Sequence, residues 1–104
     1  MNKYGLFGKL QSQAGKGDEL AEILLKAASL MEDAEGCVVY IVNKSADNPD
    51  SIWVMEVWES KDAHDDSFNI PGIRELIAQA VPILAERTQD GLTLEVLGGK
   101  GLKI

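Results

Sequence analysis

The only histidine, His64, is the residue best suited to acid–base chemistry in this sequence. Histidine has an ordinary pKa near neutrality, so it can accept and return a proton at physiological pH. Asp62, Asp65 and Asp66 flank His64 closely. This acidic run equally favours a solvated position on a helix surface, and the residues alone leave both interpretations open.

Two residues shortly before His64 could complete a small-molecule site. Glu56 and Trp58 share parity with Val54 in an apolar run over 52–58. A carboxylate on such a face could orient His64 or bind a hydroxyl group, or could instead pair with a basic side chain at a sheet edge. The Trp58 indole could stack on a flat aromatic molecule, or could serve only as core packing.

Further candidates follow from spacing and residue type. Ser67 lies three residues after His64, which places both on one helix face, so either or both could face a pocket. Tyr40, Phe7 and Phe68 are possible pocket walls, although aromatic residues in a small core more often only pack.

Other kinds of site have little support. One histidine and one cysteine, Cys37, without Cys-x-x-Cys or His-x-x-x-His spacing, cannot supply the usual zinc or iron ligands, so no metal is expected. The apolar neighbours of Cys37 favour a buried, inert thiol. The glycine-rich segment 98–101 lacks the helix and the Lys-Ser/Thr ending of a phosphate loop.

Composition excludes several partners. The formal charge is −7, from 17 acidic and 10 basic side chains, and no basic stripe is present, which argues against nucleic acid and against anionic membrane surfaces. No apolar run approaches the ~18 residues of a membrane span. A single cysteine cannot form an intramolecular disulfide, which favours the cytoplasm.

The elements that must position these residues are predicted from periodicity and turn signals. They comprise a strand over 4–13, an amphipathic helix from Asp18 to about Asp33, strands over 37–43 and 52–58, a short helix after Ser60, a helix from Pro71 to Pro82, and a strand over 92–97. This β-α-β-β-α-β order predicts an α+β, ferredoxin-like antiparallel sheet with helices on one face. At 104 residues we expect one domain over 1–104.

The same pattern predicts a homodimer. The strands over 37–43 and 52–58 carry large apolar side chains, such as Trp53, at both parities, whereas helices would cover one face only. An exposed apolar sheet of that size is not tolerated by a soluble monomer. We therefore expect two subunits to pack through their sheet faces as a dimeric α+β barrel.

The segment from Glu56 to His64 resembles the strand-to-helix junction of antibiotic biosynthesis monooxygenase domains. In those domains a strand ending in an acidic residue and an aromatic turns into a helix that bears a histidine. Element order, chain length, the Gly-Lys-Gly-Asp-Glu-Leu run over 15–20 and the segment 73–82 also fit. The resemblance therefore spans nearly the whole chain.

The resemblance implies a homodimer with a pocket between sheet and helices and, for some members, oxidation of phenolic or quinol-like substrates by O₂ without a cofactor. It implies His64 as the base and Trp58 as the residue that orients the ring. Many members carry this histidine about three residues later, at the position of Ser67.

Two alternatives stay open: a non-oxidative isomerase on the same fold, and a non-catalytic ligand-binding dimer. The haem-degrading relatives are disfavoured, because their axial histidine lies on the later helix and 73–85 contains none.

Overall fold

Strands and helices follow one another closely along the chain. The structure, a computed structural model, describes residues 2–85 and 90–102. The elements are β1 (Lys3–Gln11), α1 (Gly17–Leu30), β2 (Cys37–Lys44), β3 (Ser51–Trp58), α2 (Lys61–Asp66), α3 (Ile73–Ala80) and β4 (Asp90–Val96), with 3-10 turns η1 (Met31–Asp33), η2 (Ser67–Asn69) and η3 (Val81–Ile83). None of the helices among these residues is both long enough and apolar enough to cross a bilayer.

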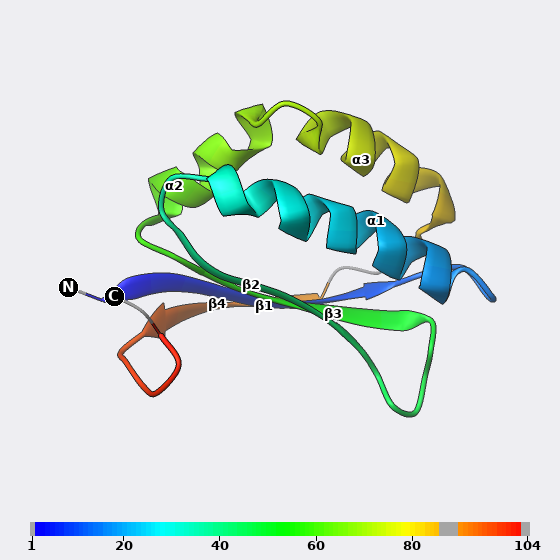
Figure 1. Ribbon diagram of the computed structural model, residues 1–104. Helices are drawn as coiled ribbons and strands as arrows, with labels where there is room; N and C mark the ends of the chain where they lie inside the picture. The colour runs from blue at the N-terminus through cyan, green and yellow to red at the C-terminus, as the bar shows by residue number, and fades with distance from the viewer. Residues whose placement is uncertain (1, 86–89, 103–104) are drawn as a thin grey trace.

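The strands form one antiparallel sheet in the order β2-β3-β1-β4. The helices α1, α2 and α3 all lie on one face of this sheet (Figure 1). Pairing β1 with β3 places the two βαβ halves side by side, which is the ferredoxin-like arrangement. The fold class predicted from the sequence is confirmed.

The start of α1 is held by a carboxylate from the loop between β2 and β3. The two oxygens of Asp50 accept hydrogen bonds from the backbone N–H groups of Gly15 at 3.1 Å and Gly17 at 3.0 Å. The bond to Gly17 satisfies a donor that a helix start leaves unpaired, and the bond to Gly15 ties the preceding turn to the same carboxylate. A side chain at position 17 would collide with the Pro49 carbonyl, so glycine allows the loop to approach this closely.

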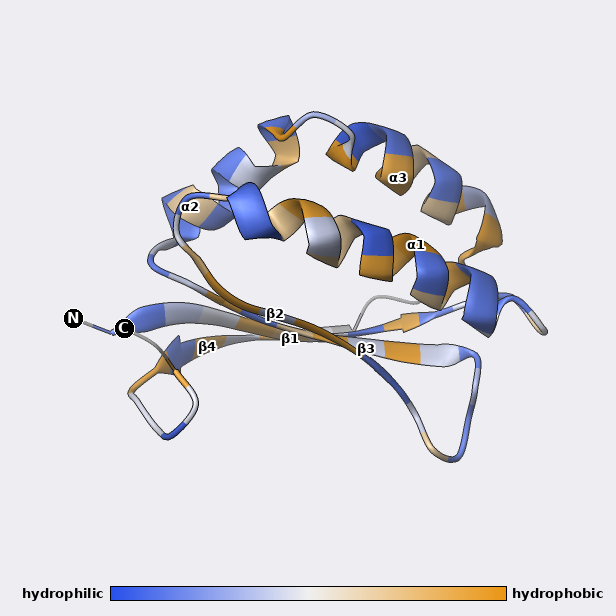
Figure 2. Cartoon of the chain, viewed as in Figure 1, coloured by the Kyte–Doolittle hydropathy of each residue, from blue (hydrophilic) through white to orange (hydrophobic). Residues whose placement is uncertain are grey.

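The core lies between the helices and the inner face of the sheet. Figure 2 shows hydrophobic residues recurring along α1 and α3 and concentrated in β2 and β3. Leu20 of α1 and Ile52 of β3 are fully buried and belong to one cluster. Trp58, also fully buried, packs with Met31 and Ile73 in a second. The amphipathic pattern of α1 thus faces β3, as its spacing predicts.

The helix predicted to begin at Pro71 begins instead at Ile73. Gly72 has a φ of 98°, in the left-handed region, so the right-handed helix can start only after it. At the other end α3 stops at Ala80 and Pro82 lies in η3, in agreement with the predicted effect of this proline.

The outer face of the sheet has no helix over it in the described part of the chain. Phe7 stacks on Trp53 there, with ring centroids 4.9 Å apart. Four further hydrophobic side chains on this face are 41–59% exposed: Ile41, Met55, Leu92 and Leu94. None of the described residues covers this outer face. A partner subunit that would cover it stays a prediction.

Candidate functional site

The register of the sheet brings a phenol beside a carboxylate on the helix-covered face. Glu56 of β3 is paired with Tyr40 of β2 on one side and with Leu6 of β1 on the other. Directly paired residues project to the same face of a sheet. Glu56 is therefore an acidic group within a layer that is otherwise largely apolar.

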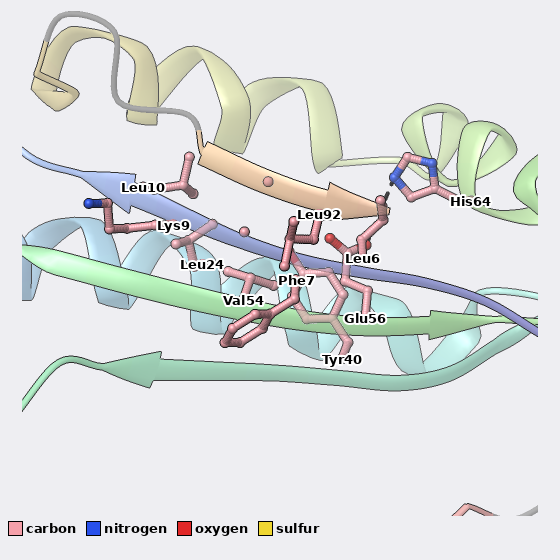
Figure 3. A pocket seen from close by; sticks show the side chains of 12 residues that line it. Leu6, Phe7, Lys9, Leu10, Leu24, Tyr40, Val54, Glu56, His64 and Leu92 are labelled. Atoms are coloured by element: carbon pink, nitrogen blue, oxygen red, sulfur yellow. Dashed lines mark ion pairs between the residues drawn. The ribbon is translucent and has the colours of Figure 1, made fainter. Parts of the chain in front are cut away.

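Helix α2 carries His64 to this carboxylate. Ser60 caps the helix, because its hydroxyl oxygen accepts a hydrogen bond from the Ala63 N–H at 3.1 Å. His64 Nε2 then lies 3.9 Å from Glu56 Oε1, and both side chains are only 17% exposed (Figure 3). His64 therefore points into the molecule and not into solvent.

The second ring nitrogen of His64 faces Asp65. Nδ1 lies 3.0 Å from Asp65 Oδ1. The hydrogen bond from Lys61, followed by that from His64, lowers the pKa of Asp65, which keeps this carboxylate ionised at neutral pH. An ionised partner at Nδ1 favours the tautomer with a proton on that nitrogen, which leaves the Nε2 lone pair available to accept one.

Three aromatic rings surround the imidazole of His64. Ring centroids lie 5.4 Å away for Phe68, 5.7 Å for Trp58 and 5.8 Å for Tyr4, with Phe68 and Trp58 meeting the imidazole edge-on. Such contacts restrict the orientation of the ring and reduce its access to water. These three rings therefore constrain the orientation of the His64 imidazole.

Burial changes the protonation of Glu56. Loss of solvation raises its pKa, while the hydrogen bond from the Trp58 indole N–H at 3.0 Å and the nearby His64 act in the opposite direction. A carboxyl group with a raised pKa can hold or release a proton nearer neutrality than an exposed glutamate. Glu56 and His64 thus place a carboxyl group and an imidazole beside each other at the cavity wall.

Tyr40 stays a protonated phenol under the same conditions. Burial, with smaller effects from Glu56 and Cys37, raises the pKa of Tyr40 well above its usual range. At neutral pH its hydroxyl can therefore donate a hydrogen bond to a developing negative charge.

Two cavities meet at these residues. The first, of about 320 Å³, runs along β1, β3 and the start of β4 (Figure 3). The second, of about 180 Å³, lies between the sheet and the helices α1 and α3. Five residues line both: Leu10, Leu24, Tyr40, Glu56 and His64. The site is thus an apolar space with a small polar centre, as is typical of small-molecule sites.

Ser67 and Phe68 line only the second cavity. Ser67 is 6% exposed, and its hydroxyl donates a hydrogen bond to the His64 carbonyl oxygen at 2.5 Å. The Ser67 hydroxyl is therefore already engaged with the backbone of His64. Phe68 is 41% exposed and contributes a wall at the edge of the cavity.

Trp58 has the core position that the sequence left open as one of its two alternatives. It is fully buried and is not among the residues that line either cavity. Ala27, Met31 and Ile73 pack in the same cluster, so no ligand in these cavities reaches the face of the indole. The indole N–H of Trp58 instead donates a hydrogen bond to the Glu56 carboxylate.

Sequence reasoning missed Leu10 and Leu24 as lining residues and Tyr4 as a neighbour of His64. The helical spacing of Leu24 indicates a buried position on the helix but does not distinguish core packing from a cavity wall. Tyr4 and Leu10 share parity along β1, which indicates that both lie on one face of the sheet. Parity alone does not show whether the helices cover that face.

No three potential metal ligands converge within residues 2–85 and 90–102. A separate hollow of about 540 Å³ lies between η1 and α2, and five carboxylate side chains line it: Asp33, Glu35, Glu59, Asp62 and Asp66. These carboxylates are spread around the hollow and form no such group.

Comparison with known proteins agrees with this architecture. Residues 4–79 match the antibiotic biosynthesis monooxygenase family. The crystal structure of a candidate antibiotic biosynthesis monooxygenase from Chloroflexus aurantiacus is 33% identical, with a TM-score of 0.88 over 97% of this chain and 99% of that chain. No curated protein matches the chain in sequence.

More distant structures share the fold. A candidate monooxygenase of the same name from Caulobacter crescentus is 21% identical, with a TM-score of 0.83 over 93% of this chain and 92% of that one. SnoaB, a cofactor-independent oxygenase from Streptomyces nogalater studied as a mutant, is 14% identical, with a TM-score of 0.78 over 97% of this chain and 99% of that one. With the family match and the closer relative, the chain belongs to the antibiotic biosynthesis monooxygenase family.

Proposed function

We propose that this protein is a cofactor-independent monooxygenase that oxidises a small phenolic or quinol-like substrate with O₂. The observation that supports this most is the pair His64 and Glu56, 3.9 Å apart and mostly buried where two apolar cavities meet. A base held away from bulk water beside an apolar pocket is suited to deprotonating a weakly acidic hydroxyl group. The shared fold with a cofactor-independent oxygenase adds support at the level of architecture.

In the proposed reaction, His64 Nε2 accepts the hydroxyl proton of the substrate. The phenolate is electron-rich and reduces O₂, which then adds to a ring carbon that carries hydrogen. Loss of water from the adduct gives the quinone. One oxygen atom enters the product, the other leaves as water, and the two hydrogens of that water come from the substrate O–H and C–H bonds.

The neighbouring side chains have distinct proposed roles. Glu56 stabilises the imidazolium that forms when His64 takes the proton, and the Tyr40 hydroxyl donates to the substrate oxygen as it becomes negative. Trp58 is a positioning residue that acts through its hydrogen bond to Glu56. Ser67 supports the backbone of His64, and Phe68 shapes the wall of the second cavity.

We also propose that the enzyme works as a homodimer joined through the outer sheet faces. The exposed side chains of Ile41, Met55, Leu92 and Leu94 form a surface that a second sheet would cover. Its one free thiol and lack of any disulfide suit a reducing compartment, so the proposed location is the cytoplasm.

The test is O₂ consumption with a panel of phenols and hydroquinones. His64→Ala and His64→Gln should each lower kcat/KM by about 10²-fold or more while leaving thermal unfolding unchanged. Leu25→Ala, at an exposed position on α1 that lines neither cavity, is the control and should keep the full rate. An unchanged rate in the His64 variants would remove this residue from the mechanism.

The same assay without O₂ separates the alternatives. Product formed without O₂ would show that the activity is that of an isomerase and not of an oxygenase. Ligand-induced thermal stabilisation without product, in air or without it, would instead indicate a binding module.

A further inference from the structure

We infer that the two cavities are chambers of one site, and that the substrate is a phenol or quinol that carries a hydrocarbon substituent. The ring occupies the first chamber and the substituent occupies the second. This inference rests on the proposed function, because the ring hydroxyl is the group presented to His64.

The chambers are continuous at the polar centre. Tyr40, Glu56 and His64 line both, and so do Leu10 of β1 and Leu24 of α1. A molecule whose hydroxyl lies against His64 therefore has a chamber on each side of that hydroxyl. A ring without a substituent would fill one chamber and leave the other empty.

The first chamber is shaped for a flat group. Gly8 and Gly91 are directly paired across β1 and β4, and both line the chamber. Neither has a side chain to fill the space above the sheet, and a Cβ placed on Gly91 would meet no atom of residues 2–85 and 90–102 within 4 Å. Tyr40 adds an aromatic wall on the same face of the sheet, which suits a ring.

The second chamber is shaped for hydrocarbon. Apart from the three residues of the polar centre, Ser67 is the one polar side chain among the described residues that line it. The Ser67 hydroxyl already donates to the His64 carbonyl. The other lining residues are all apolar and include Ile23 and Ala27 of α1 and Leu76, Ile77 and Ala80 of α3. A polar substituent here would lose its hydration without gaining a partner.

The volumes of the two chambers indicate that the second is an extension of the first and not a separate site. Sites for small molecules usually measure about 300–1,000 Å³. The first chamber, at about 320 Å³, falls within this range, whereas the second, at about 180 Å³, falls below it. The smaller chamber is therefore best explained as room for part of a ligand that is anchored in the larger one.

The second chamber opens outward along part of its wall. Phe68, Ile77 and Val81 line it and are 41%, 42% and 59% exposed. A substituent longer than the chamber would emerge past these residues into water. Affinity should therefore rise with chain length and then level off.

The experiment measures binding of hydroquinone and its methyl, propyl, pentyl and heptyl derivatives by anaerobic calorimetry, with no turnover involved. Each added methylene should tighten binding about fourfold, as expected for burial of one CH₂, until the chamber is full. Ala80→Leu narrows the second chamber only, and should abolish this gain while leaving the affinity for unsubstituted hydroquinone unchanged.

Gly91→Val is the matched variant for the first chamber, because it fills open space in a strand where a branched residue is tolerated. It should weaken every member of the series by a similar factor. Ile77→Phe, at a half-exposed position, tests the second chamber again should Ala80→Leu fail to fold.

The outcomes separate the two proposals. Equal affinity for all chain lengths, or no binding by any member, would overturn the two-chamber site. A chain-length gain that Ala80→Leu removes, without O₂ consumption by any member, would overturn the oxygenase and leave the two-chamber site standing.

Discussion

The indole N–H of Trp58 donates a hydrogen bond of 3.0 Å to the carboxylate of Glu56, two residues before it on the same face of β3. Trp58 is fully buried, so the indole cannot turn away without leaving its N–H unpaired in the core. The bond therefore fixes the carboxylate on the side where His64 lies. A core residue thus sets the geometry of a polar group at the cavity wall.

Trp58→Phe should keep most of the packing and remove only the donor. We expect a loss of about 1.5–3 kcal/mol in the free energy of unfolding at pH 7, as for a hydrogen bond to a charged group. Because the bond lowers the pKa of Glu56, its loss should also shift the acidic limb of the kcat/KM profile to higher pH. Trp53→Phe, on the outer face, is the control and should leave the profile in place.

Glu56→Gln should change how stability depends on pH. Burial raises the Glu56 pKa above its ordinary 4.5, so above that pH the folded chain holds a proton that the unfolded chain has released. The free energy of unfolding therefore falls as pH rises through this window. The variant should show a flatter dependence and be more stable than wild type at pH 7.

Urea unfolding between pH 4 and pH 8 measures this difference. Glu22→Gln removes an exposed carboxylate from α1 and should follow the wild-type curve. A Glu56→Gln protein that loses stability with pH as steeply as wild type would show that this carboxyl is not the group responsible.

Ser67→Ala should remove a hydrogen bond to the backbone of His64. The Ser67 hydroxyl donates to the His64 carbonyl at 2.5 Å, so its removal should cost about 1 kcal/mol of stability. KM should change little, because the hydroxyl has no donor left for a substrate. A large increase in KM at unchanged stability would instead return Ser67 to the role of substrate ligand that its spacing from His64 suggested.

The fold could be predicted because its signals are local. The β-branched and aromatic run over 52–58 indicates a strand, the helical spacing from Leu20 to Met31 indicates an amphipathic helix, and turn residues mark the ends. The helix start at Pro71 was wrong because the conformation of Gly72, which delays the helix, depends on backbone angles that composition does not reveal.

The site could be predicted only in part, for a related reason. Parity placed Glu56 and Trp58 on one face, and the structure keeps them there. Parity cannot predict how deeply each side chain is buried. Trp58 is covered by side chains from α1 and α3, whereas Glu56 lies at the cavity wall. The approach of Asp65 to His64 Nδ1 depends on side-chain rotamers and had no signal in the spacing.

Met55→Glu should separate the proposed dimer into single chains. Met55 lies on the outer sheet face and is 41% exposed in one subunit, so a two-fold partner would bury it. Glutamate there would place two unpaired carboxylates in an apolar interface, which is strongly unfavourable. Sedimentation equilibrium at micromolar concentration should find a dimer for wild type and the mass of one chain for the variant. Leu25→Glu, at a comparably exposed position on the helical side, should stay dimeric. A wild-type protein that sediments as one chain would mean that the apolar outer face is not covered by a second copy.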